Sequence, residues 1–135
     1  MSEGCNKMID QRPVQAQKIS EFDKAVGLEL ADFHLHVYYD ATTIEQAKQL
    51  CLAAATRFGL RMGFMHEKPV GPHPRWSCQL SVPPEKFGAV VTWFSLNRKG
   101  LTLFIHPDSG RALQDHRDHA IWMGEMLELD LSIFS

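Results

Sequence analysis

The chain has 135 residues, of which 44% are hydrophobic and 22% are charged, and its formal net charge is -2 with neutral histidines. These values fit one globular domain with a packed core and leave little room for a second domain. The charge balance provides no basic surface for nucleic acid or a membrane, and no apolar run approaches the roughly 20 residues of a transmembrane helix.

Residues 1–30 are predicted to form a flexible arm outside the domain, because they are mostly polar and offer few apolar partners. Their beginning lacks the basic start and the apolar stretch of a signal peptide. The three cysteines, Cys5, Cys51 and Cys78, are odd in number and match no zinc-finger spacing. We therefore expect a cytoplasmic protein whose thiols stay reduced.

The predicted domain, residues 31–135, begins with a strand, a helix and a second strand. Residues 33–39 alternate strictly and are rich in strand-forming residues, which predicts a strand. Apolar residues at helical spacing predict a helix from 44 to 58, which Gly59 ends. Residues 61–66 are expected to form a short strand.

A rigid turn begins the second half of the domain. Three prolines within residues 69–74 fix the backbone and cannot pair in a ladder. Residues 75–82 alternate again and predict a strand. The prolines at 83–84 suit the first turn of a second helix, which residues 97–100 end. Residues 101–106 are predicted to form the fourth strand.

The end of the chain is predicted to add one helix and a possible short strand. The helix is expected from residues 108–110 to about Met123, and residues 127–134 alternate as a strand does. The element order predicts an α+β fold of ferredoxin-like βαββαβ topology, an antiparallel sheet in the order four, one, three, two with helices on one face. Such a sheet also suits a dimer in which two copies close face to face.

Seven histidines are present, and strand alternation sorts several of them to one face. In the strand at 33–39 the apolar residues must face the helices, so His34, His36 and Tyr38 point to the other face. His106 leaves the fourth strand on that same side. The sequence therefore predicts a row of histidines on the helix-free face of the sheet.

Strand directions are expected to bring further histidines to the same edge. The fourth strand should run antiparallel beside the first, which places His106 near His34. We expect the strand at 75–82 to run parallel to the first strand, so that the preceding turn lies at this edge too. The histidines expected to converge are His34, His36, His66, His73 and His106.

Such a convergence favours a metal centre, because neutral imidazole binds iron, zinc, copper and nickel. Two histidines at i and i+2 on a strand can share one ion from the same face. The spacing alone also fits half-buried strand histidines at His34 and His36, a strand-end residue at His106, and exposed loop histidines at His66 and His73. Convergence of all five is what distinguishes the metal site from these readings.

The third predicted helix carries two more histidines. His116 and His119 are one turn apart, so both can face the site, or both can be surface residues in a polar stretch. Asp115 or Asp118 can orient an imidazole ligand. Trp122 is expected to be a core aromatic residue.

Three stretches of the chain resemble the DOPA 4,5-dioxygenase family. They are the strand at 34–40, the turn at 66–74, and the stretch from 106 through 116 with the apolar residues 120–122. The likeness extends from about Asp32 to the end. It implies a ferredoxin-like fold, a homodimer, and extradiol cleavage of a catechol such as L-DOPA by O2. Non-haem Fe(II) is the implied cofactor, and Zn(II) can occupy the site in purified protein.

The resemblance and the sheet geometry together suggest roles for individual residues. His34, His36 and His106 are the expected metal ligands, His73 is the expected acid/base, and Tyr38 is expected to hydrogen-bond the ring oxygens. Arg75 is expected to pair with a substrate carboxylate. The other residues expected to contact substrate are His66, Glu67 and His116.

The ligand set and the function each leave alternatives. Non-haem iron is commonly held by two histidines and a carboxylate, and Glu67 is the nearest candidate; otherwise the site is all histidine. One alternative function is a small-molecule-binding protein without redox activity, metal-free or zinc-bound. Another is a cofactor-free isomerase or decarboxylase that uses His73 as base. For the dioxygenase the partners are a small aromatic substrate and O2.

Overall fold

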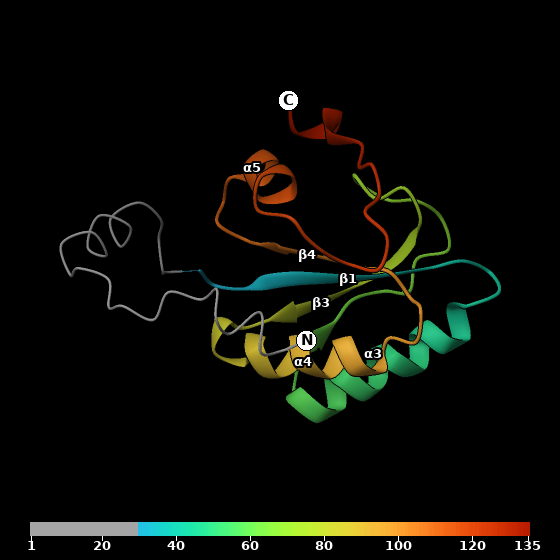
Figure 1. Ribbon diagram of the computed structural model, residues 1–135. Coiled ribbons are helices and arrows are strands. Elements are labelled where there is room, and N and C mark those ends of the chain that lie inside the picture. The colour runs from blue at the N-terminus through green and yellow to red at the C-terminus, as the bar shows by residue number, and fades with distance from the viewer. Residues whose placement is uncertain (1–29) are drawn as a thin grey trace, which may run out of the picture.

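The computed structural model describes residues 30–135 and contains one five-stranded antiparallel sheet in the order β2-β3-β1-β4-β5 (Figure 1). The predicted arm, apart from its last residue, lies outside the described residues. The strands are β1 (Phe33–Tyr39), β2 (Arg61–Met62), β3 (Trp76–Val82), β4 (Leu103–Pro107) and β5 (Ile121–Met123). The helices are α3 (Ile44–Phe58), α4 (Phe87–Asn97) and α5 (Ala112–Arg117), with short 3-10 turns η1 (Pro84–Lys86) and η2 (Leu131–Phe134).

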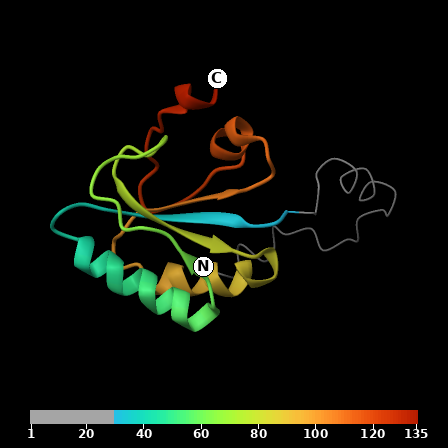
Figure 2. The same cartoon turned by 180° about the vertical axis from the view of Figure 1, so that it is seen from behind.

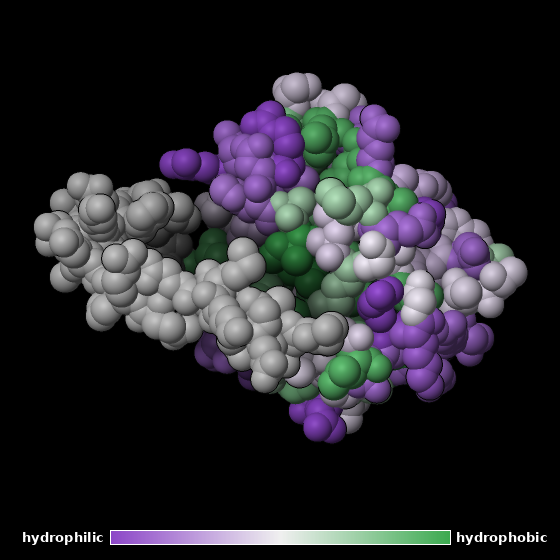
Figure 3. Space-filling model, in the orientation of Figure 1, coloured by the Kyte–Doolittle hydropathy of each residue, from purple (hydrophilic) through white to green (hydrophobic). Residues whose placement is uncertain are grey.

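The two long helices, α3 and α4, lie together against one face of the sheet, and α5 and η2 lie on the other side (Figures 1 and 2). Figure 3 shows hydrophilic residues over α5. Apolar residues lie beside them and near the middle of this view. The predicted α+β class with an antiparallel sheet is confirmed. The face that was predicted to be free of helices is partly covered by α5 and by the end of the chain. Within residues 30–135 no helix has the length and apolar character needed to cross a membrane.

Strand β1 is the centre of the sheet and follows its predicted bounds. It pairs with β3 on one side and with β4 on the other. Leu35, Val37 and Tyr39 are buried in the core against α3 and α4, as the alternation predicted. The residues between them, among them His36 and Tyr38, are equally buried but face the other side. One strand therefore supplies both the core and the candidate site.

The predicted direction of β3 is wrong. β1 and β3 are antiparallel, with His34 opposite Ser81 and Tyr39 opposite Trp76. The reason is topological: the crossover through α3 makes β2 parallel to β1, and the hairpin to β3 reverses the chain again. The chain after β2 therefore runs toward the Tyr39 end of β1, away from His34, and β3 begins there at Trp76. β2 is also shorter than predicted, because the chain leaves the regular ladder after Met62.

The end of the chain also differs from the prediction. The third helix stops at Arg117, and residues 121–123 form β5, in which Trp122 pairs with Phe104 of β4. Ile121 and Trp122 favour a strand, and the free edge of β4 gives it a partner. The stretch at 127–134 ends in the 3-10 turn η2 rather than in a strand.

The end of α3 depends on a glycine with a left-handed backbone. Gly59 has φ 66° and ψ 43°, and its N–H donates to the carbonyl of Ala55. The Lys86 ammonium donates to the carbonyl of Phe58 at 2.6 Å. Together these groups satisfy carbonyls that the helix end leaves without partners.

We expect Gly59→Ala to lower the free energy of unfolding by about 1 kcal/mol, because a Cβ disfavours the left-handed backbone. Gly88→Ala is the matched control. Gly88 lies in α4, and a Cβ there meets nothing within 4 Å, so the same change should raise stability by up to about 1 kcal/mol. Urea unfolding of both variants tests this, and equal signs for the two would contradict it.

Candidate metal centre and active site

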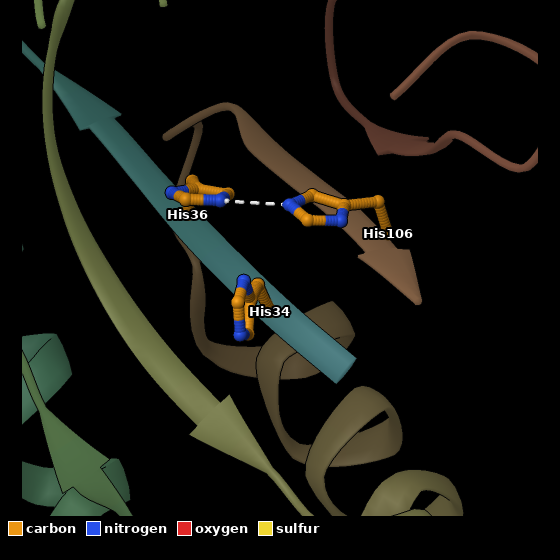
Figure 4. Close-up of side chains that lie close together, drawn as sticks. All are labelled: His34, His36 and His106. Carbon is orange, nitrogen blue, oxygen red and sulfur yellow. Dashed lines mark hydrogen bonds between the residues drawn. The ribbon is translucent and has the colours of Figure 1, made fainter. Parts of the chain in front are cut away.

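Strands β1 and β4 bring three predicted ligands together on the side opposite α3 and α4. His34 is directly opposite His106 in the β1–β4 register, and His36 follows two residues later on the same face. One ring nitrogen from each of the three lies within 4.8 Å of those of the other two, and the rings face a common space (Figure 4). The predicted convergence of these three residues is confirmed, and they could hold a metal ion.

The pair His36 and His106 has the spacing that a shared metal ion needs. Their Nε2 atoms are 3.2 Å apart. Two imidazole nitrogens each about 2.0–2.1 Å from one ion lie roughly 3–3.4 Å apart at tetrahedral or octahedral angles. Nδ1 of His106 is 2.8 Å from the carbonyl oxygen of Pro107. A carbonyl only accepts, so this Nδ1 carries the proton and Nε2 keeps its lone pair. The residues present therefore fit a divalent metal.

Burial keeps these imidazoles neutral. His36 is 4% exposed and His106 is 3% exposed. Desolvation lowers the pKa of His36 well below its usual value, and repulsion from His73 and His106 adds to this. Burial lowers the pKa of His106 to about 4, although the hydrogen bond to Pro107 opposes the shift. Neutral imidazole is the form that binds metal.

His73 reaches the cluster from the loop between β2 and β3. This loop turns back over the sheet at Gly71, whose φ is 55°, and the N–H of His73 donates to the carbonyl of Val70 at 3.0 Å. The His73 ring lies 4.1 Å from the His36 ring, between centroids. Its Nδ1 is 2.7 Å from the Tyr38 hydroxyl. His73 therefore joins the cluster as predicted, but because the loop folds back and not because β3 is parallel to β1.

Burial also shifts the pKa values of His73 and Tyr38. It lowers the pKa of His73 to about 4, with His116 and His106 adding repulsion. It raises the pKa of the Tyr38 phenol, which therefore keeps its proton at neutral pH. The result is a neutral imidazole hydrogen-bonded to a protonated phenol beside a candidate ligand.

His116 approaches the cluster from α5. Its Nδ1 donates to the carbonyl of Ala112 at 2.7 Å, and its ring lies 3.9 Å from that of His106. Asp115 does not orient a histidine. It is buried and accepts hydrogen bonds from the N–H and hydroxyl of Ser109 at 2.8 and 2.7 Å, which fixes the loop before α5.

The other two candidates from the third predicted helix, His119 and Asp118, lie on the surface. His119 is exposed. Asp118 forms a surface ion pair with Arg117, so it does not orient an imidazole either.

Other predicted contact residues lie near the far end of β1. Arg75 and Glu125 form an ion pair at 3.2 Å and line a cleft of about 550 Å³ that Tyr38 also lines. His66 is half-buried and close enough to His73 to help lower the pKa of that residue. Glu67 is exposed and is not among the residues whose ligand atoms gather in the cluster, so it does not supply the missing carboxylate.

Three residues of the site were not among the predicted ones. Phe104 is fully buried, and its ring lies 5.3 Å from His106 and 4.6 Å from Trp122. Trp122 was expected in the core but packs on this side instead, 6.1 Å from the Tyr38 ring. Asp108 places Oδ2 3.6 Å from Nε2 of His34. Alternation in β4 points Phe104 and His106 the same way, whereas no local pattern identifies Asp108.

The fold and this cluster define an α+β protein with a histidine site that could hold a metal ion. A model of the Dopa 4,5-dioxygenase family matches residues 33–133. The chain therefore belongs to this family, and the predicted resemblance is confirmed.

Two curated proteins are similar to this chain. An uncharacterised protein of Botryotinia fuckeliana is 39% identical over 113 residues, which cover 75% of this chain and 62% of the relative. DOPA 4,5-dioxygenase of Amanita muscaria is 28% identical over 127 residues, which cover 84% of this chain and 54% of the relative. The chain thus spans less than two thirds of either curated protein.

The fold is also found in a crystal structure from Nostoc punctiforme described as that of a candidate dioxygenase. The two chains are 38% identical and superpose with a TM-score of 0.74, over 77% of this chain and 90% of the other. This likeness supports both the fold and the family.

The lowered pKa values predict that the metal-free protein loses stability in mild acid. In the unfolded chain these histidines take up protons near pH 6.5. In the folded protein His73 and His106 stay neutral until the pH falls to about 4. The unfolded state then binds more protons, so the free energy of unfolding falls as pH drops through this window. Each histidine contributes up to roughly 1.4 kcal/mol per pH unit.

Urea unfolding in chelator between pH 7.5 and 4.5 measures this slope. We expect His73→Asn to reduce the slope and His119→Asn, at an exposed position, to leave it unchanged. A slope that His73→Asn does not alter would contradict the prediction.

Proposed function

We propose that this chain is an extradiol dioxygenase that cleaves a catechol such as L-DOPA with O2. The observation that carries the proposal is the cluster of His34, His36 and His106 with His73 and Tyr38 beside it. Family membership and the dioxygenase relatives support it. The unit we propose for this activity is the ferredoxin-like domain over residues 31–135.

In this proposal His34, His36 and His106 hold the metal, and the expected metal is Fe(II). When bound, Fe(II) supplies a centre at which a catechol and O2 can be held together and exchange electrons. The nitrogen donors also suit Zn(II), which we expect in protein purified in air. The near-complete burial of His36 and His106 leaves the half-buried His34 on the accessible side of the cluster.

His73 is the proposed acid/base. The ring is neutral at pH 7 and so has a lone pair for the proton of a catechol hydroxyl, while the pKa lowered to about 4 makes it a weaker base than a free histidine. The Tyr38 hydroxyl both donates and accepts, so its 2.7 Å contact with Nδ1 can be kept in either tautomer of His73. Tyr38 can also hydrogen-bond the ring oxygens as predicted.

The proposed substrate contacts surround these groups. His116 presents its free Nε2 near His106, since its Nδ1 is held by Ala112. Arg75 and Tyr38 line the same cleft, where Arg75 could pair with a substrate carboxylate. His66 and Glu67 belong to the same loop as His73 and complete the proposed set. We propose a cytoplasmic homodimer as the working form, as the family resemblance implies.

Replacing His36 with alanine should remove bound metal and catechol cleavage together, because the variant loses one of the closely spaced nitrogen donors. Metal analysis of anaerobically purified protein, with O2 uptake and the absorbance of the ring-opened product, measures both. His119→Ala is the matched control, since His119 is exposed and lies outside the cluster.

Two outcomes would overturn this assignment. Full activity in His36→Ala would exclude the proposed ligand. Turnover that survives exhaustive chelation would favour the cofactor-free isomerase or decarboxylase instead.

Replacing His73 with glutamine should lower kcat by about 10²-fold or more while metal content stays unchanged, because the acid/base is lost and the ligands remain. Tyr39→Phe is the control from the adjacent position. The single proton of the Tyr39 hydroxyl is shared between the carbonyl oxygens of His66 and Ser77, 2.8 and 3.0 Å away, so its loss should reduce stability and leave kcat unchanged. A kcat that depends on Tyr39 and not on His73 would contradict the assignment.

A further inference from the structure

A carboxylate lies beside the candidate ligand His34, at a position to which no role has been given. Asp108 follows β4 directly, and its Oδ2 lies 3.6 Å from Nε2 of His34. The backbone N–H of Asp108 donates to the carbonyl of Asp32 at 2.9 Å. This bond extends the β1–β4 ladder one step beyond the pair Phe33 and Pro107. The backbone of Asp108 is therefore held in register with the strand that carries His34.

Two other carboxylates near β1 and β4 are engaged with other partners. Asp115 accepts two hydrogen bonds from Ser109, and Glu125 pairs with Arg75. Among the described residues, Asp108 is the carboxylate that lies at ion-pair distance from a histidine of the cluster.

The orientation of His34 calls for such a partner. Figure 4 shows one nitrogen of the His34 ring directed toward His36 and His106 and the other directed away from them. A histidine that gives one nitrogen to a metal usually donates its other N–H to a carboxylate or carbonyl, which fixes the ring and raises its basicity. His106 has the Pro107 carbonyl for this purpose. For His34 the adjacent acceptor is Asp108.

We propose that Asp108 is a positioning residue for the metal centre. This proposal rests on the proposed function only in that His34 is a ligand. Its carboxylate accepts the outward N–H of His34 and so holds the inward nitrogen toward the metal. The 3.6 Å separation exceeds a hydrogen bond. Rotation of the half-exposed Asp108 side chain closes it when His34 binds the ion. Asp108 also places a negative charge against a centre whose three ligands are neutral.

Metal affinity tests this directly, without relying on turnover. Metal-free protein is titrated with Co(II) and with Zn(II) against a chromophoric chelator. We expect Asp108→Ala to weaken binding about 10- to 100-fold, the usual effect of losing such a partner. Asp108→Asn keeps an acceptor oxygen without the charge and should recover part of the loss. Asp118→Asn is the matched control, because Asp118 pairs with Arg117 on the surface.

A spectroscopic measurement separates positioning from general damage to the fold. In Zn(II)-loaded protein, NMR should show the outward N–H of His34 in a hydrogen bond to a carboxylate in the wild type. In Asp108→Ala its 1H and 15N shifts should move and its exchange with solvent should speed up, with the N–H of His106 unchanged. Equal metal affinity in the wild type and Asp108→Ala, or an unaltered His34 N–H resonance, would overturn the inference and leave the dioxygenase proposal standing. A wild type that binds neither metal would remove both. A wild type that binds metal without cleaving catechols, and still depends on Asp108, would remove only the proposed reaction.

Discussion

The central position of β1 is the constraint on which the rest of the structure depends. A strand with neighbours on both sides has its two faces set by alternation alone, and a shift of one residue would exchange them. With Leu35 and Val37 in the core, His36 and Tyr38 must face the other side. Burying imidazoles this way is unfavourable unless they stay neutral, which the lowered pKa of His36 reflects. The same alternation that builds the core therefore creates a cluster of neutral nitrogen donors.

Desolvation links the stability of this cluster to its chemistry. Imidazoles at close range repel one another only when they are protonated. The metal-free site is therefore tolerated near pH 7 and unfavourable in acid. The neighbouring groups satisfy the ring nitrogens without charge: the Pro107 carbonyl for His106, and the Tyr38 phenol for His73. An ion that binds the remaining lone pairs would stabilise the folded state by mass action. The arrangement suits an entering metal better than an entering proton.

The local sequence pattern correctly predicted the bounds of those elements that local interactions determine. The bounds of β1 and α3 follow from alternation, helical spacing and Gly59, and the structure reproduces them. The direction of β3 follows from the connection through α3 and the next hairpin, so it had to be derived from the topology, and that derivation was wrong. The end of α5 and the strand at Trp122 depend on the free edge of β4, which is a tertiary feature. Propensity is a weak guide wherever such a partner decides the outcome.

His73 shows how a residue can be placed correctly beside the cluster by incorrect reasoning about strand direction. The wrong strand direction placed its loop at the His34 end, whereas the loop joins β3 at the Tyr39 end and folds back to His36. The reversal depends on a proline-rich segment around Gly71, whose restricted backbone limits the paths that the loop can take. Asp108 could not be found in this way, because its contact with His34 depends on register beyond the end of β4. Histidines were identifiable because many of them share one face, whereas a single carboxylate is identified only by its distance to a ligand.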